Sequence, residues 1–259
     1  MRQLMTILLI TLLPLSASAE TAEEKGLAII QEADRRDTGW VDATADMQMI
    51  LRNKQGEASE RELRISNLEV DGDGDKSLSV FDSPKDIKGT ALLSYTHALE
   101  PDDQWLYLPA LKRVKRIASA NKSGPFVGSE FAYEDLTSQE VEKYSYKWLR
   151  DETLDGREAF VIEAYPAYEN SGYTRQVVWL DKEMYRPIRI DYYDRKDALL
   201  KTLEAGDWNR YLDRYWRPGR MNMVNHQTGK STELLWDNYQ FKTGLSDRDF
   251  DQATLKRTR

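Results

Sequence analysis

The sequence has no cysteine and only two histidines, His97 and His226, among its 259 residues. Disulfides, thiolate metal ligands and a lipid-modified cysteine are therefore excluded, and nucleophilic catalysis has few groups to use. No G-x-S-x-G motif occurs. A two-histidine metal site would need both rings to meet a carboxylate, for which the spacing gives no support. We predict no enzymatic activity, no metal and no cofactor.

Long apolar runs are scarce as well. The main one, residues 4–13, follows Met1-Arg2 and precedes Ala-Ser-Ala at 17–19, the pattern of a cleavable secretory signal peptide. It is short for a membrane span, which needs ~20 residues. We predict a signal peptide over 1–19, one domain over 20–259, and no transmembrane segment in the mature chain. An exported chain without disulfides favours the periplasm of a Gram-negative type envelope.

A basic excess is also missing. The chain has 37 Lys and Arg against 44 Asp and Glu, and its net charge is −7. Nucleic-acid binding depends on neutralising phosphates with positive charge, so we predict no nucleic-acid partner. Seven Trp, fourteen Tyr and six Phe, by contrast, supply large rings for a core or a pocket.

The pattern of apolar residues predicts one helix followed by a β-sheet. Residues 21–24, Thr-Ala-Glu-Glu, form a capping box before apolar residues at helical spacing, which predicts a helix over 22–37. From residue 46 onward the period is two, with turn signals between short segments. This predicts roughly ten to twelve antiparallel strands in a sandwich, barrel or curved open sheet. Segment 119–136 is irregular and long enough to be functional.

Two acidic patterns resemble chemical sites. Asp71, Asp73 and Asp75 imitate calcium-loop spacing, but Lys76 stands where the loop needs glycine, which favours a solvated hairpin turn. The pair Glu134-Asp135 has the residue types of an acid–base couple and underlies one alternative, a hydrolase of envelope glycans or lipids. In a chain with 44 acidic residues, one such pair carries little information.

Four basic residues, Lys112, Arg113, Lys115 and Arg116, lie in and beside a predicted strand over 114–117. One interpretation is a charged edge strand that resists pairing with other sheets. The other is a rim that contacts anionic headgroups or an acidic partner surface.

The methionines occur as pairs two residues apart, Met47 with Met49 and Met221 with Met223. On a strand each pair shares one face. Methionine there is typical of core filling, and on the concave side of an open sheet its adaptable thioether also suits acyl chains.

One stretch resembles a known family. It runs Trp105-x-Tyr-Leu-Pro-Ala-Leu-Lys-Arg-Val-Lys-Arg-Ile117 and continues at Phe126-Val-Gly-Ser-Glu-Phe-Ala-Tyr-Glu-Asp-Leu136. It is similar to the bacterial outer-membrane lipoprotein-sorting proteins of the LolA/LolB-like superfamily. Further matches are Lys88-Gly-Thr-Ala-Leu-Leu93, Val178-Trp-Leu-Asp181, Pro187 and Met221-x-Met-x-Asn225-x-x-Thr-Gly229.

The resemblance implies a mainly β fold: a strongly curved antiparallel sheet that forms an incomplete barrel, with the helix and loops over its concave face. It implies a cavity for acyl chains, without catalysis or cofactor. Members of the family look like accessory partners of membrane exporters of the resistance-nodulation-division type. The absence of cysteine makes this chain resemble the soluble carrier more than the lipid-anchored acceptor.

We therefore predict a periplasmic, non-enzymatic carrier or chaperone for lipids or lipoproteins, with an exporter adaptor as the alternative. Strand alternation places the predicted cavity residues at Met47, Met49, Leu106, Leu108, Val177, Trp179, Ile188, Ile190, Met221 and Met223. Phe126, Phe131 and Tyr133 are predicted to form a lid. Replacement of Phe126 and Phe131 by serine is predicted to weaken binding of an apolar probe and to leave the melting temperature nearly unchanged. Lys112, Arg113, Lys115 and Arg116 are predicted to contact headgroups or a partner.

Overall fold

In the computed structural model, residues 19–257 are described, so the predicted signal peptide lies outside this range except for Ala19. The chain forms one α-helix, α1 (Ala22–Asp37), and one 13-stranded sheet. The strands are β1 (Asp42–Arg52), β2 (Ala58–Leu68), β3 (Lys76–Ser83), β4 (Ala91–Tyr95), β5 (Asp103–Leu108), β6 (Arg113–Arg116), β7 (Tyr144–Leu154), β8 (Arg157–Pro166), β9 (Tyr173–Asp181), β10 (Pro187–Asp194), β11 (Leu199–Tyr211), β12 (Tyr215–Asn225) and β13 (Ser231–Phe241).

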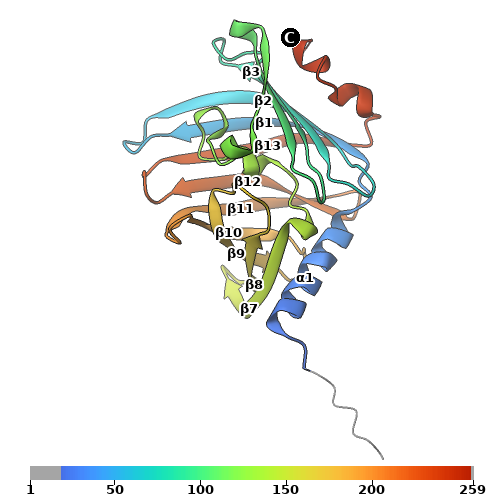
Figure 1. The fold of residues 1–259 in the computed structure, drawn as a ribbon, viewed down its shortest axis with the longest axis vertical. Coiled ribbons are helices and arrows are strands. Elements are labelled where there is room, and N and C mark those ends of the chain that lie inside the picture. The colour runs from blue at the N-terminus through green and yellow to red at the C-terminus, as the bar shows by residue number, and fades with distance from the viewer. Residues whose placement is uncertain (1–18, 258–259) are drawn as a thin grey trace, which may run out of the picture.

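The sheet is antiparallel throughout and does not close. Its order is β6-β5-β4-β3-β2-β1-β13-β12-β11-β10-β9-β8-β7. Strands that follow one another in the chain are neighbours in the sheet, except β6 and β7, and the first strand β1 pairs with the last strand β13. Strands β6 and β7 are the two edges. Figure 1 shows the strong curvature that gives the sheet a concave and a convex face. The predicted incomplete barrel is confirmed, with slightly more strands than expected.

The helix begins and ends where the sequence predicts. The Thr21 hydroxyl accepts a hydrogen bond from the Glu24 amide at 3.1 Å, and the Glu24 carboxylate accepts one from the Thr21 amide at 2.9 Å. This capping box satisfies amide groups that have no partner within the helix. The helix lies against β7, the strand at one edge of the sheet (Figure 1). Gly26 allows the contact, because a Cβ there would stand 2.7 Å from the backbone nitrogen of Trp148.

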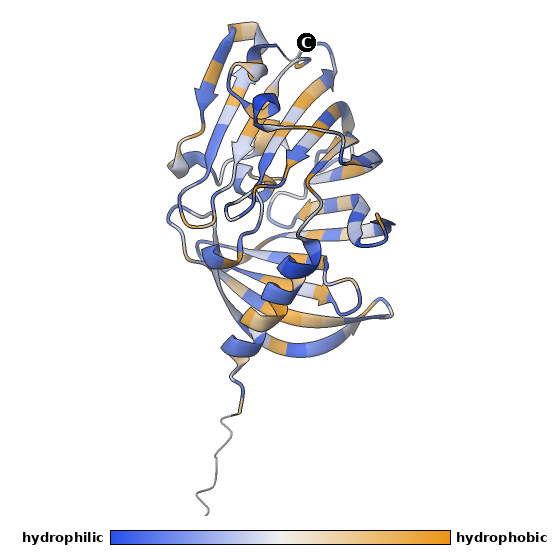
Figure 2. Ribbon diagram, turned by 90° about the vertical axis from the view of Figure 1, so that its right-hand side faces the viewer, coloured by the Kyte–Doolittle hydropathy of each residue, from blue (hydrophilic) through white to orange (hydrophobic). Residues whose placement is uncertain are grey.

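The main core lies on the concave face. Hydrophobic and polar residues alternate along the strands (Figure 2), and the inward-facing ones pack with Ile29 and Ala33 of α1. A separate cluster covers the convex face of β3 and β4, where Phe250 and Leu255 of the C-terminal segment pack on Leu78 and Leu93. The two faces of the sheet are therefore buried by different parts of the chain.

Residues 119–136, here called the covering segment, cross the concave face without forming a strand of the sheet. Short 3₁₀ turns replace regular structure, and Val127 adopts a left-handed φ of 46°. The segment is tied to the sheet by buried contacts, one of which joins Asp135 to Lys201 at 2.6 Å. It therefore forms part of the folded core.

Candidate ligand-binding cavity

A cavity of about 890 Å³ lies between α1 and the concave face of β7 to β10. Pockets that enclose small ligands occupy roughly 300–1,000 Å³. Seven of the apolar side chains that line it lie on α1, β7, β8 and β9 and belong to the main core or pack against it. We call them the apolar floor: Ile30, Ala33, Tyr146, Ile162, Ala164, Val178 and Leu180. Three consecutive inner strands and one helix face thus supply the apolar surface.

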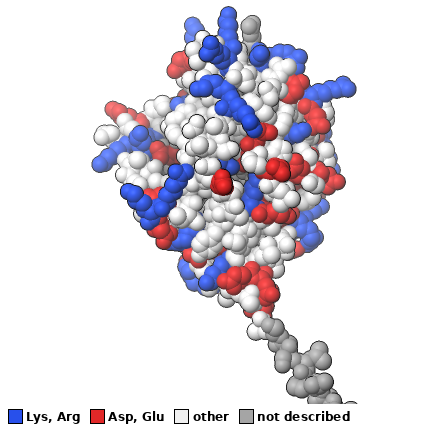
Figure 3. Space-filling view, in the orientation of Figure 1, with Lys and Arg blue, Asp and Glu red and all other residues white. Residues whose placement is uncertain are grey.

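Carboxylates from three parts of the chain line the same cavity. They come from the end of α1, from the β2–β3 connection and from the residues just before β7. We call this set the acidic rim: Asp34, Asp37, Glu69, Asp71, Asp73, Asp75, Glu140 and Glu142. Arg186 is the only basic residue among the lining residues. Figure 3 shows acidic side chains gathered near the end of α1, on the right of the view.

Part of the acidic rim is neutralised or hydrogen-bonded. Asp37 pairs with Arg186 and, at 2.7 Å, with Arg217. Asp73 accepts from the Nδ1 of His97 at 2.8 Å, and this bond, with help from the Ala98 amide, lowers the pKa of Asp73 to about 2. The side chain of Asp73 therefore ties the turn at 71–75 to His97 and Ala98. Among residues 19–257, no group of three or more histidine and carboxylate side chains is arranged to hold a metal ion.

The remaining carboxylates are less well compensated. Burial, joined by the charges of Glu69 and Asp37, raises the pKa of Asp75 to about 6. Burial and the nearby Asp75 charge raise the pKa of Glu140 to about 7. The pKa of Asp34 is also raised, first by burial and then by Glu142 and Asp37. These carboxylates therefore lie close enough for their charges to affect one another's pKa.

Tyr146 of β7 is the one lining residue of the apolar floor that carries a polar group. The residue is 6% exposed, and its hydroxyl oxygen makes no hydrogen bond within the described part of the chain. Burial raises the pKa of this phenol, with smaller effects from Glu142, Asp34 and Glu140. A buried hydroxyl that lacks a partner is unfavourable, and because this oxygen has almost no accessible surface it is not open to a ligand in the cavity.

None of the ten predicted cavity residues lines this cavity. Met47, Met49, Met223 and Ile190 are buried in the main core, and Met221 packs against it. Leu106 and Leu108 line a second pocket of about 420 Å³ under the covering segment, together with Lys115 and Tyr133. The methionine pairs thus fill the core, which was one of the two roles considered for them.

The predicted inward orientation of Val177, Trp179 and Ile188 is wrong. These residues form a separate cluster with Ala159, Val161 and Met184, while Val178 and Leu180 face the cavity. Strand β9 is buried on both faces, so alternation of hydrophobicity does not identify the inner one. In β10, an irregularity in the pairing with β9 between Pro187 and Arg189 separates Ile188 from Ile190.

The predicted lid also needs correction. Phe126 and Phe131 are 1% and 3% exposed and belong to the main core, with Phe126 packed on Phe81 and Tyr133. Truncation of a buried phenylalanine typically costs about 3–5 kcal/mol. Serine at these positions is therefore expected to destabilise the fold. The expectation of an unchanged melting temperature does not agree with this burial.

The basic residues lie at the edge of the sheet. Arg113, Lys115 and Arg116 are exposed on β6, and Lys112 precedes the strand in a left-handed conformation. Arg116 forms an ion pair with Asp103 of β5. Their contact with headgroups or a partner stays a prediction.

The carboxylate pair proposed for a hydrolase is occupied by structural contacts. Glu134 accepts hydrogen bonds from Tyr168, Ser171 and the Gly172 amide at 2.8–3.1 Å, and burial raises its pKa. Asp135 accepts from Tyr173 at 2.7 Å and pairs with Lys201. Both carboxylates anchor the covering segment, so this pair gives no support to hydrolysis.

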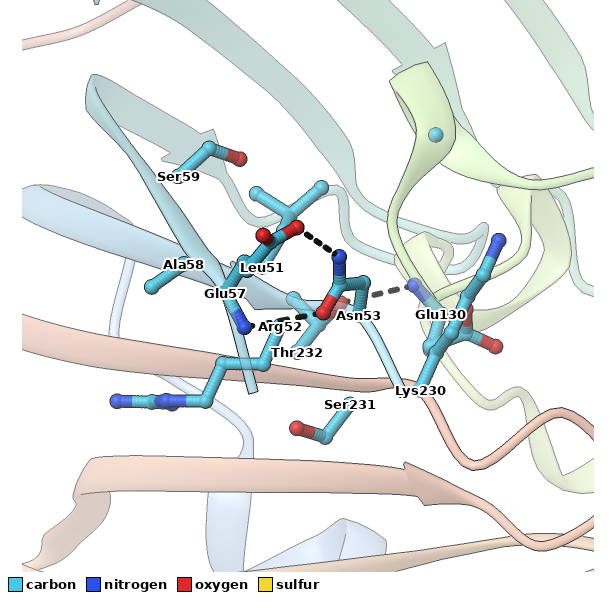
Figure 4. Close-up of a pocket in the computed structure, with 11 residues that line it drawn as sticks. Leu51, Arg52, Asn53, Glu57, Ala58, Ser59, Glu130, Lys230, Ser231 and Thr232 are labelled. Atoms are coloured by element: carbon cyan, nitrogen blue, oxygen red, sulfur yellow. Dashed lines mark hydrogen bonds between the residues drawn. The ribbon is translucent and has the colours of Figure 1, made fainter. Parts of the chain in front are cut away.

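A third pocket, of about 350 Å³, lies where the covering segment meets the turns after β1 and before β13. Figure 4 shows that its polar groups bond to one another. The side chain of Asn53 accepts a hydrogen bond from the Glu57 amide at 3.0 Å and donates one to the Glu57 carboxylate at 2.7 Å. The Glu130 amide donates to the hydroxyl of Thr232 at 2.9 Å. These bonds hold the turns and the covering segment together.

Comparison with known proteins places the chain in a family. Residues 73–257 match a family described as an uncharacterized protein. No curated protein shows significant sequence similarity to the chain. Among solved structures, an outer membrane lipoprotein-sorting protein domain from Vibrio parahaemolyticus is 59% identical with a TM-score of 0.89, over 91% of this chain and 100% of that one.

Two further solved structures have a similar fold. A DUF1329 family protein from Desulfovibrio piger is 30% identical with a TM-score of 0.86, over 91% of this chain and 99% of that one. A LolA superfamily protein from Nitrosomonas europaea is 19% identical with a TM-score of 0.71, over 91% and 100%, and shares the fold.

The open sheet, its covered concave face and its apolar cavity define a LolA-like half-barrel. The chain belongs to the family that contains the outer membrane lipoprotein-sorting domain and the DUF1329 protein. In residues 19–257, no helix has the length and apolar character to cross a membrane.

The sequence prediction missed the cavity residues because they come together only in three dimensions. The floor joins α1 to β7, β8 and β9, and the rim adds the connection before β3. One usable signal was present: Ile30 and Ala33 continue the apolar face of the predicted helix, with Asp34 and Asp37 beside them. An acidic border on that face marks where the helix leaves the core.

Proposed function

We propose that this protein is a periplasmic, non-enzymatic carrier that binds the acyl chains of lipids or lipoproteins in the cavity beside α1. The observation that carries the proposal is the apolar floor of a cavity of about 890 Å³ on the concave face. The name of its relative at 59% identity, an outer membrane lipoprotein-sorting domain, supports the same role. An adaptor with a vestigial pocket would be expected to have this space filled by side chains.

The affinity expected from such a cavity suits a carrier. Burial of one methylene group contributes ~0.8 kcal/mol, so a buried stretch of about ten contributes roughly 8 kcal/mol before the cost of immobilising the ligand. For a single acyl chain this corresponds to a dissociation constant of about 1 μM or weaker. A ligand held at this strength is released readily, which transfer to an acceptor requires.

The test reduces the cavity volume by enlarging a side chain of α1. Ala33 lies in the wall and is buried, whereas Ala28 is exposed on the same helix. Ala33→Phe is expected to weaken binding of the uncharged fluorophore N-phenyl-1-naphthylamine about tenfold or more, because the new ring occupies ligand space. Ala28→Phe, the matched control, is expected to bind as the parent protein does. Fluorescence titration measures binding, and thermal unfolding confirms that both variants fold.

Native mass spectrometry of protein purified from membranes provides the complementary measurement. Co-purified lipid in the parent protein, absent from Ala33→Phe, supports the carrier. Equal probe affinity in a well-folded Ala33→Phe protein would show that the cavity is not the binding site.

A further inference from the structure

The second pocket, under the covering segment, is separate from the cavity beside α1. Its volume of about 420 Å³ lies within the range of pockets that enclose small ligands. It is bordered by β5, β6 and the covering segment, and no described residue lines both spaces. Its larger apolar lining residues are Leu106, Leu108, Ile117, Pro125 and Tyr133. The pocket therefore offers apolar surface that the proposed function does not use.

The pairing of β5 with β6 decides which basic residues project toward this pocket. Lys115 lies opposite Leu106, and Arg113 lies opposite Leu108. Residues directly opposite one another on paired strands project to the same face of the sheet. Leu106 belongs to the main core on the concave face, and Leu108 packs against it. Lys115 and Arg113 therefore project to the concave side, and Lys115 lines the pocket itself.

Ion pairing differs between the two faces of β6. Arg116 lies opposite Trp105, which packs with the convex cluster, and it forms an ion pair with Asp103. Within residues 19–257, the side chains of Arg113 and Lys115 make neither an ion pair nor a hydrogen bond, and none of the described lining residues of the pocket is acidic. Resistance to edge pairing would be served by charge on either face, so it does not account for this difference.

We propose that the second pocket binds anionic amphiphiles, with a carboxylate or phosphate head at Lys115 and Arg113 and the apolar chain against Leu106, Leu108 and Tyr133. It is a ligand site in addition to the cavity on which the proposed function rests. Both basic side chains can donate charge-assisted hydrogen bonds to an anionic head. Because these side chains are exposed, water weakens their attraction for a free anion, and binding requires burial of the apolar chain as well.

The experiment places a fluorescent reporter at this pocket. The chain has no cysteine, so a single introduced cysteine is labelled uniquely. Ala120 lines the pocket and is exposed, and Ala120→Cys labelled with acrylodan is expected to change its emission when decanoate binds. The same label on Ala28→Cys, on the exposed face of α1, is the matched control and is expected not to respond. Thermal unfolding confirms that both labelled proteins fold.

The probes separate the head from the chain. Decanoate, decanol and decylammonium share one chain length, whereas acetate and inorganic phosphate supply an anion without a chain. At about pH 8 the carboxylic acid is ionised and the amine is charged. Decanoate is expected to bind about tenfold more tightly than decanol, and decylammonium more weakly than decanol. Acetate and phosphate are expected to produce no response, which distinguishes an amphiphile from a free anion.

Neutralisation of the two basic residues tests their role. Arg113→Gln with Lys115→Gln, in the labelled protein, is expected to weaken decanoate binding about tenfold and to leave decanol binding unchanged. Lys85→Gln with Lys88→Gln makes the same charge change at exposed positions outside the pocket and is expected to keep the preference for decanoate.

A salt series gives a second readout. Between ionic strengths of about 0.01 M and 1 M the Debye length falls from about 30 Å to about 3 Å. The preference for decanoate over decanol is therefore expected to decrease with added salt in the parent protein. It is expected to stay low and nearly constant in Arg113→Gln with Lys115→Gln.

The outcomes distinguish this inference from the proposed function. If decanoate causes no response at Ala120→Cys, or binds no more tightly than decanol, the assignment of the second pocket is overturned while the cavity beside α1 is unaffected. A preference for decanoate that survives in Arg113→Gln with Lys115→Gln would overturn it too. If Ala33→Phe abolishes the response at Ala120→Cys, the two spaces are one site and the inference fails. If Ala33→Phe leaves fluorophore affinity unchanged while the decanoate response persists, the second pocket is supported and the proposed function is contradicted.

Discussion

The covering segment depends on a buried ion pair. The side chains of Asp135 and Lys201 are each 4% exposed and lie 2.6 Å apart. Lys201 also donates to the Glu130 carbonyl at 2.8 Å, and Asp135 accepts from the Ala132 amide at 2.6 Å. Ionised groups at this depth are stable only when their charges and hydrogen bonds are matched.

Removal of one partner is therefore expected to be more harmful than removal of both. Lys201→Met leaves the Asp135 carboxylate buried without its cation and is expected to lower the free energy of unfolding by about 3–5 kcal/mol. The double variant Lys201→Met with Asp135→Asn is expected to recover part of this loss. Urea denaturation at neutral pH measures both. A loss below about 1 kcal/mol in the single variant would refute the anchoring role.

At the level of single residues, sequence patterns predicted burial better than orientation. Val177, Trp179 and Ile188 are buried, as their hydrophobicity indicates, but they lie outside the main core. When both faces of a strand are covered, every position is apolar and the period of two is lost. Only the packing partners, which are distant in the sequence, decide which face is concave.

The bounds of the helix and of the strands, unlike the orientation of strand residues, could be predicted from local sequence signals. Thr21 and Glu24 mark the beginning of α1, and the strands follow their alternating patterns closely. The sequence did not predict that α1 packs on β7, although Gly26, a glycine inside the predicted helix, indicated close packing at that point. A glycine inside a helix weakens it by about 1 kcal/mol relative to alanine, so its presence points to a packing requirement.

Gly26→Ala tests that requirement. The added methyl group would lie 2.7 Å from the Trp148 nitrogen and 3.0 Å from the Lys147 carbonyl carbon, and the backbone of β7 cannot yield as a flexible side chain would. We expect a net loss of about 1–2 kcal/mol, because overpacking outweighs the gain in helix propensity. Urea denaturation measures it. Ala28→Gly, on the exposed face, calibrates propensity alone, and a more stable Gly26→Ala protein would disprove close packing.

At the scale of the whole molecule, an open sheet has exposed edges, and β6 is one of them. It pairs only with β5, and three of its four side chains are exposed and basic. Unpaired strand edges promote association between molecules, and charged side chains on such strands oppose it. This interpretation of the basic cluster requires no ligand, and it can be tested separately from headgroup contact.

Replacement of the charge on this edge is expected to cause self-association. Arg113→Val with Lys115→Val leaves Val114 between two β-branched residues, so the strand gains β-propensity and loses its repulsion. Lys85→Val with Lys88→Val, in the exposed β3–β4 connection, is the matched control. Both pairs make the net charge of −7 more negative by the same amount. Sedimentation velocity is expected to show dimers or larger species for the β6 variant alone, because edge pairing depends on position. Monomers in both variants would leave headgroup or partner contact as the remaining role for these basic residues.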